Sequence, residues 1–300
     1  MANDWPPPDL QYVLRNIPSQ DLGNWLIALG RPRPANQAEA VFAAEAEPES
    51  SLRPLYIANR FLVRGVAVTW FRNVGKPGSE KITNALPKYD PKERDFEGDY
   101  GLLWIDESDE GPRLRLAYKE ATRLVRVGLN LEPVSQLGII TLLWRAINVN
   151  GEVFRVLQIH IRSPLVRRAI LELLPAFGCD KSKLQVLDVR DNSRADGIKA
   201  GLGGTLADAV AEIDEPAVPD DRASFSARAG RDLSEPGAKF ADYSHYPGRG
   251  RTIHCKVDGY LLRFKISQVD YSVVFSQANL EHTDVVFREA VNVGSWISYP

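Results

Sequence analysis

Two apolar runs that flank Asn150-Gly151 form the clearest pattern along this chain. Asn-Gly is the favoured pair for a two-residue type I′ turn, in which both residues take positive φ. A turn at this point places Val149 opposite Glu152 and Trp144 opposite Leu157. The pattern therefore predicts a long antiparallel hairpin over 139–162.

The two faces of this predicted hairpin differ in polarity. The mixed face carries Thr141, Arg145, Gln158 and His160 among apolar residues, and we expect His160 to be an ordinary hydrogen-bonded sheet histidine. The apolar face carries Ile140, Leu142, Trp144, Ala146, Val153, Leu157, Ile159 and Ile161. Such strands belong in a sheet covered mainly on one side. We predict an α+β fold: a mostly antiparallel sheet built on this hairpin, helices on one side, and a helical N-terminal segment.

A second hairpin is predicted over 251–266, where Asp258-Gly259 supplies another type I′ turn signal. This register places Val257 opposite Tyr260 and His254 opposite Arg263. One face is apolar and the other is polar and cationic. A helix that begins near Asn279 or Thr283 completes a C-terminal unit over 251–300.

The N-terminal segment, residues 1–54, reads as an extended proline-rich arm followed by short helices. Asp9 is the expected cap of the first helix. Residues 55–74 predict a strand or two with a bend at Arg64-Gly65. Together with the long hairpin, residues 55–213 form the expected α+β core.

The second half of the core begins with Ser163-Pro164, a strong helix start in which serine is the N-cap. A strand over 184–189 would complete a βαβ connection and make part of the sheet parallel. Residues 205–213 read as a helix, with Thr205 and Asp208 resembling a capping box. The proline- and acid-rich residues 214–250 read as a loop or linker.

Composition excludes some classes of function. The 300 residues are 44% hydrophobic and 25% charged with a formal net charge of −2, so the chain as a whole is not a polyanion binder. Two cysteines do not make a disulfide framework. With no signal peptide and no apolar run of about 18 residues, we expect a cytoplasmic protein without a membrane segment.

The second hairpin nevertheless concentrates positive charge, in a chain with 26 Arg and 11 Lys. A row of cations suits a phosphate backbone, because neutralising phosphates releases counterions. The competing interpretation is a solvated outer face that protects the sheet from edge pairing. The candidate nucleic-acid-binding residues are Arg249, Arg251, Lys256, Arg263 and Lys265, extended by Arg167 and Arg168 at the start of the 163–177 helix.

A hydrolytic site is the main alternative. His245 and His254, with Asp242 and Asp258 nearby, are residue types that bind a metal or act as a general base. The short paired spacings typical of zinc sites are absent, so we expect no metal or cofactor. The glycine run at 201–204 lacks the lysine of a phosphate-binding loop, and the acids between Asp95 and Glu110 are expected to form a solvated rim.

The sequence thus favours a non-enzymatic binding or assembly protein, such as a nucleic-acid-contacting subunit of a nucleoprotein or capsid-like assembly. The alternatives are a metal-dependent hydrolase or nuclease that uses His245 and His254, and a protein-only scaffold. Other protein subunits are expected partners, with self-association through residues 1–30.

Overall fold

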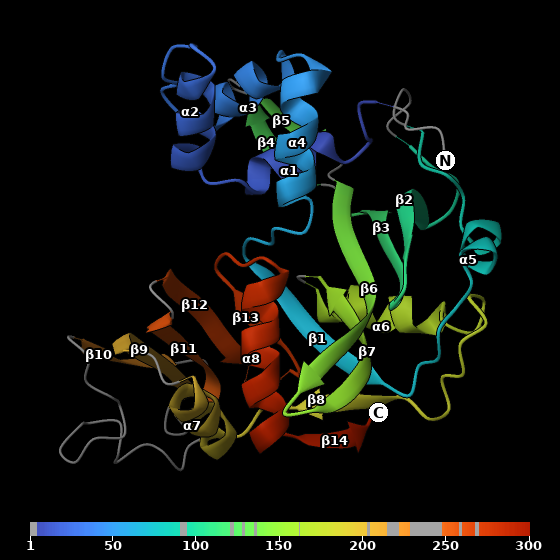
Figure 1. Cartoon of the computed structure of the whole chain (residues 1–300), viewed down its shortest axis with the longest axis vertical. Coiled ribbons are helices and arrows are strands. Elements are labelled where there is room, and N and C mark those ends of the chain that lie inside the picture. Colours follow the sequence, from blue (N-terminus) through green and yellow to red (C-terminus); the bar gives the residue numbers. More distant parts are fainter. Residues whose placement is uncertain are drawn as a thin grey trace.

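A computed structural model describes residues 5–90, 95–120, 123–127, 130–134, 137–161, 163–202, 205–214, 222–228, 248–257, 260–267 and 270–300. Within 123–134 and 205–261, and at Asn192, it describes the backbone alone. Figure 1 shows the N-terminal helices at one end of a large sheet, with helix α8 (Leu280–Val293) crossing the sheet's lower half. The fold is α+β, as predicted.

Among the described residues, the large sheet contains 12 strands in the order β10-β9-β11-β12-β13-β1-β7-β6-β3-β2, with β8 paired to β1 and β14 paired to β8. The strands are β1 Val66–Arg72, β2 Tyr100–Ser108, β3 Gly111–Lys119, β6 Leu137–Val149, β7 Glu152–His160, β8 Gln185–Asp188, β9 Thr205–Asp214, β10 Arg222–Arg228, β11 Gly248–Val257, β12 Tyr260–Ser267, β13 Val273–Phe275 and β14 Ser295–Ser298. A separate pair is formed by β4 (Arg123–Val127) and β5 (Asn130–Val134). Strands β7 and β8 pair antiparallel with β1 on its two edges, so they run in the same direction with β1 between them, and helix α6 (Pro164–Glu172) connects them. The expected βαβ connection is therefore present, but the described strands of the sheet pair with their neighbours in antiparallel fashion, so the expected parallel pairing is wrong.

The long hairpin is formed by β6 and β7, interior strands of the sheet that lie between β1 and β3. Val149 pairs with Glu152 and Trp144 with Leu157, which confirms the predicted register. Asn150 has φ 52° and Gly151 has φ 90°, the positive values that a type I′ turn requires. The second hairpin, β11–β12, also has its predicted register, because His254 pairs with Arg263 and Val257 with Tyr260.

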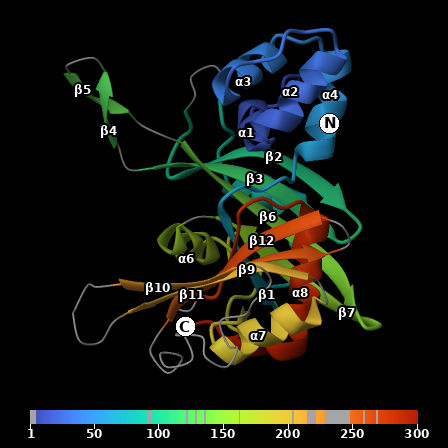
Figure 2. The ribbon, with the colours of Figure 1, turned by 90° about the vertical axis from the view of Figure 1, so that its left-hand side faces the viewer.

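Helices cover both sides of the sheet, although the sequence favours one side. Helix α6 (Pro164–Glu172) packs on the apolar face of the hairpin, and α8 (Leu280–Val293) packs on the mixed face. Figure 2 shows these two helices on opposite sides of the strands. The reason is that the mixed face is also substantially apolar: Trp70 and Phe154 lie 5.5 and 6.2 Å from the ring of Phe287 on α8.

The N-terminal helices form a small unit with its own apolar core. They are α1 (Leu10–Asn16), α2 (Ser19–Ala28), α3 (Gln37–Glu45) and α4 (Glu49–Asn59). Trp5 packs edge-on against Tyr56 of α4, so the described part of the proline-rich arm folds back on its own unit. Residues 55–59 belong to α4 rather than to a strand. The predicted bend at Arg64-Gly65 is confirmed by φ 59° at Gly65, just before β1.

Two further expectations are wrong. Residues 205–213 lie in strand β9 and not in a helix, because β9 pairs with both β10 and β11 and long-range pairing outweighs an alanine-rich composition. Strand β10 lies inside the expected loop over 214–250, of which residues 215–221 and 229–247 lie outside the described residues. The remaining helices are α5 (Ser79–Ala85) and α7 (Asn192–Gly201).

Candidate functional site

Strand β12 carries the described part of the predicted cationic surface. Leu262, Phe264 and Ile266 are fully buried and alternate with Arg263, which is exposed, and Lys265, which is half-buried. This is the period of two expected when one face of a strand packs on a core. The side of β12 that carries Arg263 and Lys265 is called the cationic strand face below.

The cationic strand face lies on the same side of the sheet as α6. Lys265 pairs with Val274, and Val274 pairs with Ala67 on β1. Paired residues share a face, as do residues two apart on a strand, so Lys265 shares the face of Thr69. Arg167 of α6 donates a hydrogen bond to the Thr69 hydroxyl at 3.0 Å, which places α6 on that face. The exposed Arg168 of α6 therefore lies on the same side as Arg263 and Lys265.

Arg167 is buried and is bound to other residues of the chain. Its side chain is 2% exposed and donates to the Asp270 carboxylate as well as to Thr69. A guanidinium held this way links α6 to the segment after β12. We therefore leave Arg167 out of the surface that a partner would reach.

The other predicted cations lie on β11, for which only the backbone is described. Lys256 pairs with Leu261, next to the cationic strand face in register, whereas Arg251 pairs with the buried Ile266. Arg249 lies near the start of β11. His254 pairs with Arg263, and His245 lies outside the described residues.

The acidic residues between Asp95 and Glu110 are mostly bound to neighbours within the chain. Asp106 accepts from Arg60 at 3.2 Å, and Glu110 accepts from Arg113 at 3.2 Å. Among the described residues, no three His, Cys, Asp or Glu side chains gather as metal ligands would. Asp106 and Glu110 are therefore partly exposed but paired with arginines of the same chain, and so differ from the purely solvated rim that was expected.

His160 lies at the centre of the sheet and is 2% exposed. The Gln158 amide nitrogen lies 2.8 Å from His160 Nε2 and donates to it, as expected for a hydrogen-bonded sheet histidine. Burial, reinforced by nearby Arg115 and Arg145, lowers the pKa of His160 from 6.5 to about 3. His160 is therefore neutral at physiological pH and inaccessible to a substrate.

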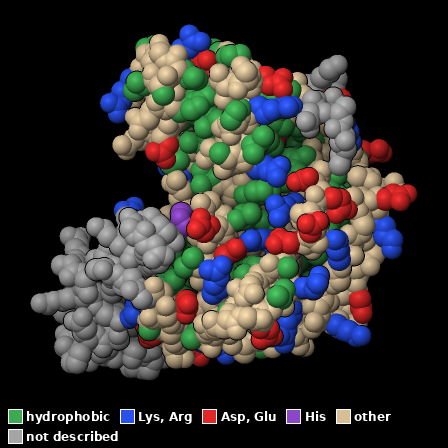
Figure 3. All heavy atoms as spheres, in the orientation of Figure 1, with side chains coloured by type: hydrophobic (Ala, Val, Ile, Leu, Met, Phe, Trp, Pro, Cys, Tyr) green, Lys and Arg blue, Asp and Glu red, His purple; other side chains and the backbone are tan. Residues whose placement is uncertain are grey.

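A cavity of about 750 Å³ lies where the N-terminal helices meet the sheet. Its walls come from α1, the entry to β1, the end of β3, the start of β6 and the segment after β13. We call it the junction cavity; it is lined by Tyr12, Arg15, Asn16, Arg64, Gly65, Val66, Tyr118, Glu120, Leu137, Gly138, Ile139 and Ser276. Figure 3 shows the surface hollowed between the helical unit and the body of the molecule.

A buried polar network fixes the α1 wall of the junction cavity. Asp9 forms an ion pair with Arg115 of β3 and also accepts hydrogen bonds from Tyr56 at 3.0 Å and Trp104 at 2.6 Å. The Arg115 guanidinium lies 5.1 Å from the ring of Tyr12, a cavity residue. Asp9 makes no side-chain cap for α1, although the helix begins at Leu10 as expected. Its carboxylate instead holds α1 against the sheet.

No sequence pattern predicts the junction cavity, because its residues are spread from Tyr12 to Ser276 and follow no common spacing. Comparison with models of protein families, with curated proteins and with solved structures finds no match. No helix among the described residues combines the length and apolar character needed to cross a bilayer. The cationic strand face and the junction cavity are therefore the two candidate functional surfaces of the described residues.

Proposed function

We propose that this chain is a non-enzymatic binding or assembly protein that contacts a nucleic-acid backbone through the cationic strand face. The observation that carries the proposal is the exposed Arg263, two residues from Lys265 on a strand whose other side is fully buried. A rigid strand presents such cations at a fixed spacing. Phosphate contacts of this kind position a strand of nucleic acid without reading its sequence.

The location of α6 supports the same surface. Arg168 is exposed on the side of the sheet that carries Arg263 and Lys265. Arg249 and Lys256 belong to the neighbouring strand β11 and remain part of the proposal, whereas Arg251 shares the opposite face with the buried Ile266 and is left out of it. Such a surface would bind single or double strands with a strong dependence on salt, because counterion release dominates the free energy.

Fluorescence anisotropy with labelled single- and double-stranded DNA and RNA tests this proposal. We expect binding at low salt that falls steeply as salt rises. Charge reversal by Arg263→Glu with Lys265→Glu should weaken binding and lower the salt slope by roughly 0.9 per lost contact to duplex DNA. Lys183→Glu, an exposed charge reversal before β8, is the matched control.

The same titration separates the alternatives. Equal affinity of the Arg263→Glu/Lys265→Glu variant and the Lys183→Glu control for nucleic acid would overturn the proposal. An absence of binding at low salt would also overturn it. Strands that become shorter with Mg²⁺ but not with chelator would indicate the hydrolase. A protein-only scaffold predicts that the charge reversals have no effect and that removing residues 1–9 disrupts oligomers, which size-exclusion chromatography would show.

A further inference from the structure

We propose that the junction cavity binds a nucleotide, with its phosphate toward Arg15 and Arg64 and its base toward Tyr12 and Glu120. This inference goes beyond the proposed function, because it concerns a second site of different shape and chemistry. A volume of about 750 Å³ lies in the range of pockets that hold small ligands.

The cationic side of the cavity supports recognition of a phosphate. Arg15 of α1 and Arg64 before β1 are both exposed and both line the cavity. Arg15 donates to the neutral side chain of Gln11 at 3.0 Å, a contact that leaves its positive charge uncompensated. The planar guanidinium carries five donors that match phosphate oxygens in geometry.

Asn16 supplies an additional donor at the same wall. The Asn16 residue is 8% exposed, and its amide nitrogen has no hydrogen-bond partner among the described residues. An unsatisfied buried donor is destabilising, and the terminal torsion of asparagine is soft. A rotation about that torsion would turn the nitrogen toward an oxygen atom of a bound ligand.

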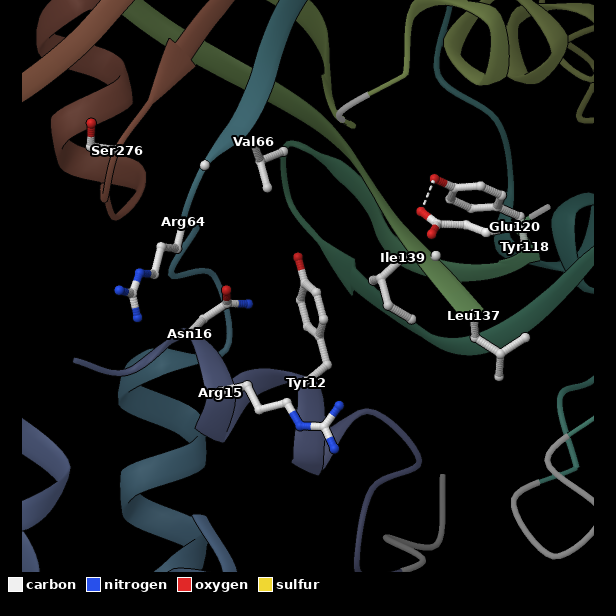
Figure 4. Close-up of a pocket in the computed structure, with 12 residues that line it drawn as sticks. Tyr12, Arg15, Asn16, Arg64, Val66, Tyr118, Glu120, Leu137, Ile139 and Ser276 are labelled. Atoms are coloured by element: carbon white, nitrogen blue, oxygen red, sulfur yellow. Dashed lines mark hydrogen bonds between the residues drawn. The ribbon is translucent and has the colours of Figure 1, made fainter. Parts of the chain in front are cut away.

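The opposite side of the cavity suits the base. Figure 4 shows the Tyr12 hydroxyl pointing into the cavity, with Arg64 and Glu120 on opposite sides of the ring. The Glu120 carboxylate accepts a hydrogen bond from Tyr118 at 2.9 Å and keeps further acceptor capacity. Carboxylates accept from the amino and ring N–H groups of bases, while Tyr12 and the apolar Leu137 and Ile139 offer surface to the ring.

The cavity also adjoins the cationic strand face. Ser276, on the cavity wall, donates its backbone N–H to the Arg263 carbonyl at 3.1 Å. The nucleotide would therefore come from either of two sources with the same chemistry. It is a free nucleotide, or it is the phosphorylated end of a strand that lies along Arg263 and Lys265.

Calorimetric titration of the full chain separates these sources. The probes are the four ribonucleoside monophosphates, the matching nucleosides, inorganic phosphate, and one oligonucleotide with and without a 5′-phosphate. We expect monophosphates to bind more tightly than either nucleosides or phosphate alone. Preference for the 5′-phosphorylated strand over free nucleotides would assign the site to strand ends, and the reverse would assign it to free nucleotides.

Three variants locate the binding. Arg64→Glu should lower the affinity for monophosphates by about tenfold or more, and Arg64→Lys should retain much of it. Glu120→Gln should change the order of preference among the four bases while leaving the requirement for phosphate. Arg33→Glu, in the same helical unit but outside the cavity, should have no effect.

The proposal of a nucleotide site and the proposal of a nucleic-acid surface can be tested independently. Arg263→Glu with Lys265→Glu should leave free monophosphate binding unchanged. No heat of binding for any monophosphate at millimolar concentration, or equal losses in Arg64→Glu and Arg33→Glu, would overturn the nucleotide site. Far-ultraviolet circular dichroism and melting temperature identify any variant that fails to fold.

Discussion

Asp9 and Arg115 form an ion pair in which both side chains are at most 1% exposed. The pair joins the start of α1 to strand β3 and is completed by donors from Tyr56 and Trp104. Burial, with the adjacent Asp9 carboxylate, raises the pKa of Tyr56, so its hydroxyl remains a donor. This fully desolvated ion pair is one of the contacts that hold the N-terminal helical unit against the sheet, together with the Arg60–Asp106 pair.

Removing the charge of Asp9 should therefore lower the free energy of unfolding substantially. Asp9→Asn leaves the Arg115 guanidinium buried without a counter-ion, and we expect a loss of roughly 3–5 kcal/mol in the free energy of unfolding. Urea titration followed by circular dichroism measures it. Glu49→Gln, which breaks the exposed pair with Arg53, should cost less than about 1 kcal/mol. A similar small loss for both variants would contradict the structural role of Asp9.

His160 should make stability depend on pH. Its pKa is about 3 in the fold against an ordinary value of 6.5, so at pH values between these the unfolded chain binds a proton that the folded chain does not. Stability must then fall as pH falls below 6.5, by about 1 kcal/mol between pH 7.5 and 5.5. His160→Gln should flatten this part of the profile, measured by urea titration at several pH values. An unchanged slope would mean that other groups cause the dependence.

Phe287 should be the most sensitive position of α8. Its fully buried ring contacts both Trp70 and Phe154, so Phe287→Ala removes the packing between the helix and the mixed face of the hairpin. We expect a loss of about 3–5 kcal/mol on chemical unfolding. Phe42→Ala, at a side chain that is 75% exposed, is the matched control and should be nearly neutral.

The central turn should tolerate little substitution. Gly151 has φ 90°, a conformation that residues with a Cβ atom rarely adopt, so Gly151→Ala should cost about 1 kcal/mol or more. Gly23 lies inside α2, where alanine is favoured over glycine, and its added Cβ would meet Pro34 at an ordinary 3.6 Å, so Gly23→Ala should be neutral or slightly stabilising. Thermal melting of the two variants would reveal the difference, and equal melting temperatures would argue against the type I′ turn.

The sequence predicted correctly those features of the fold that are determined by residues close together in the chain. Asn150-Gly151 defined a hairpin because a two-residue turn fixes both the backbone conformation and the register of its strands. Ser163 predicted the start of α6 for a similar reason, since its hydroxyl caps the first turn. In both cases the residues that determine the structure lie within a few positions of one another.

Long-range structure was less accessible. Residues 205–213 are alanine-rich and were expected to be helical, but pairing with two distant strands makes them β9. The use of Asp9 in an ion pair instead of a cap depends on Arg115, which no local pattern connects to it. The junction cavity escaped prediction because it exists only after five separate segments have come together.

The walls of the junction cavity include both Tyr12 and Ser276, which lie near opposite ends of the chain. A bound molecule would contact both the first helix and the C-terminal part of the sheet, and would therefore hold these two parts of the chain together. Binding to the native state alone adds RT ln(1 + [L]/Kd) to stability, and this gain would be shared by segments the molecule never touches. Occupancy of the junction cavity should therefore slow proteolysis throughout α1–α4. Removing either the segment that carries Tyr12 or the segment that carries Ser276 would remove one wall of the cavity and abolish this protection.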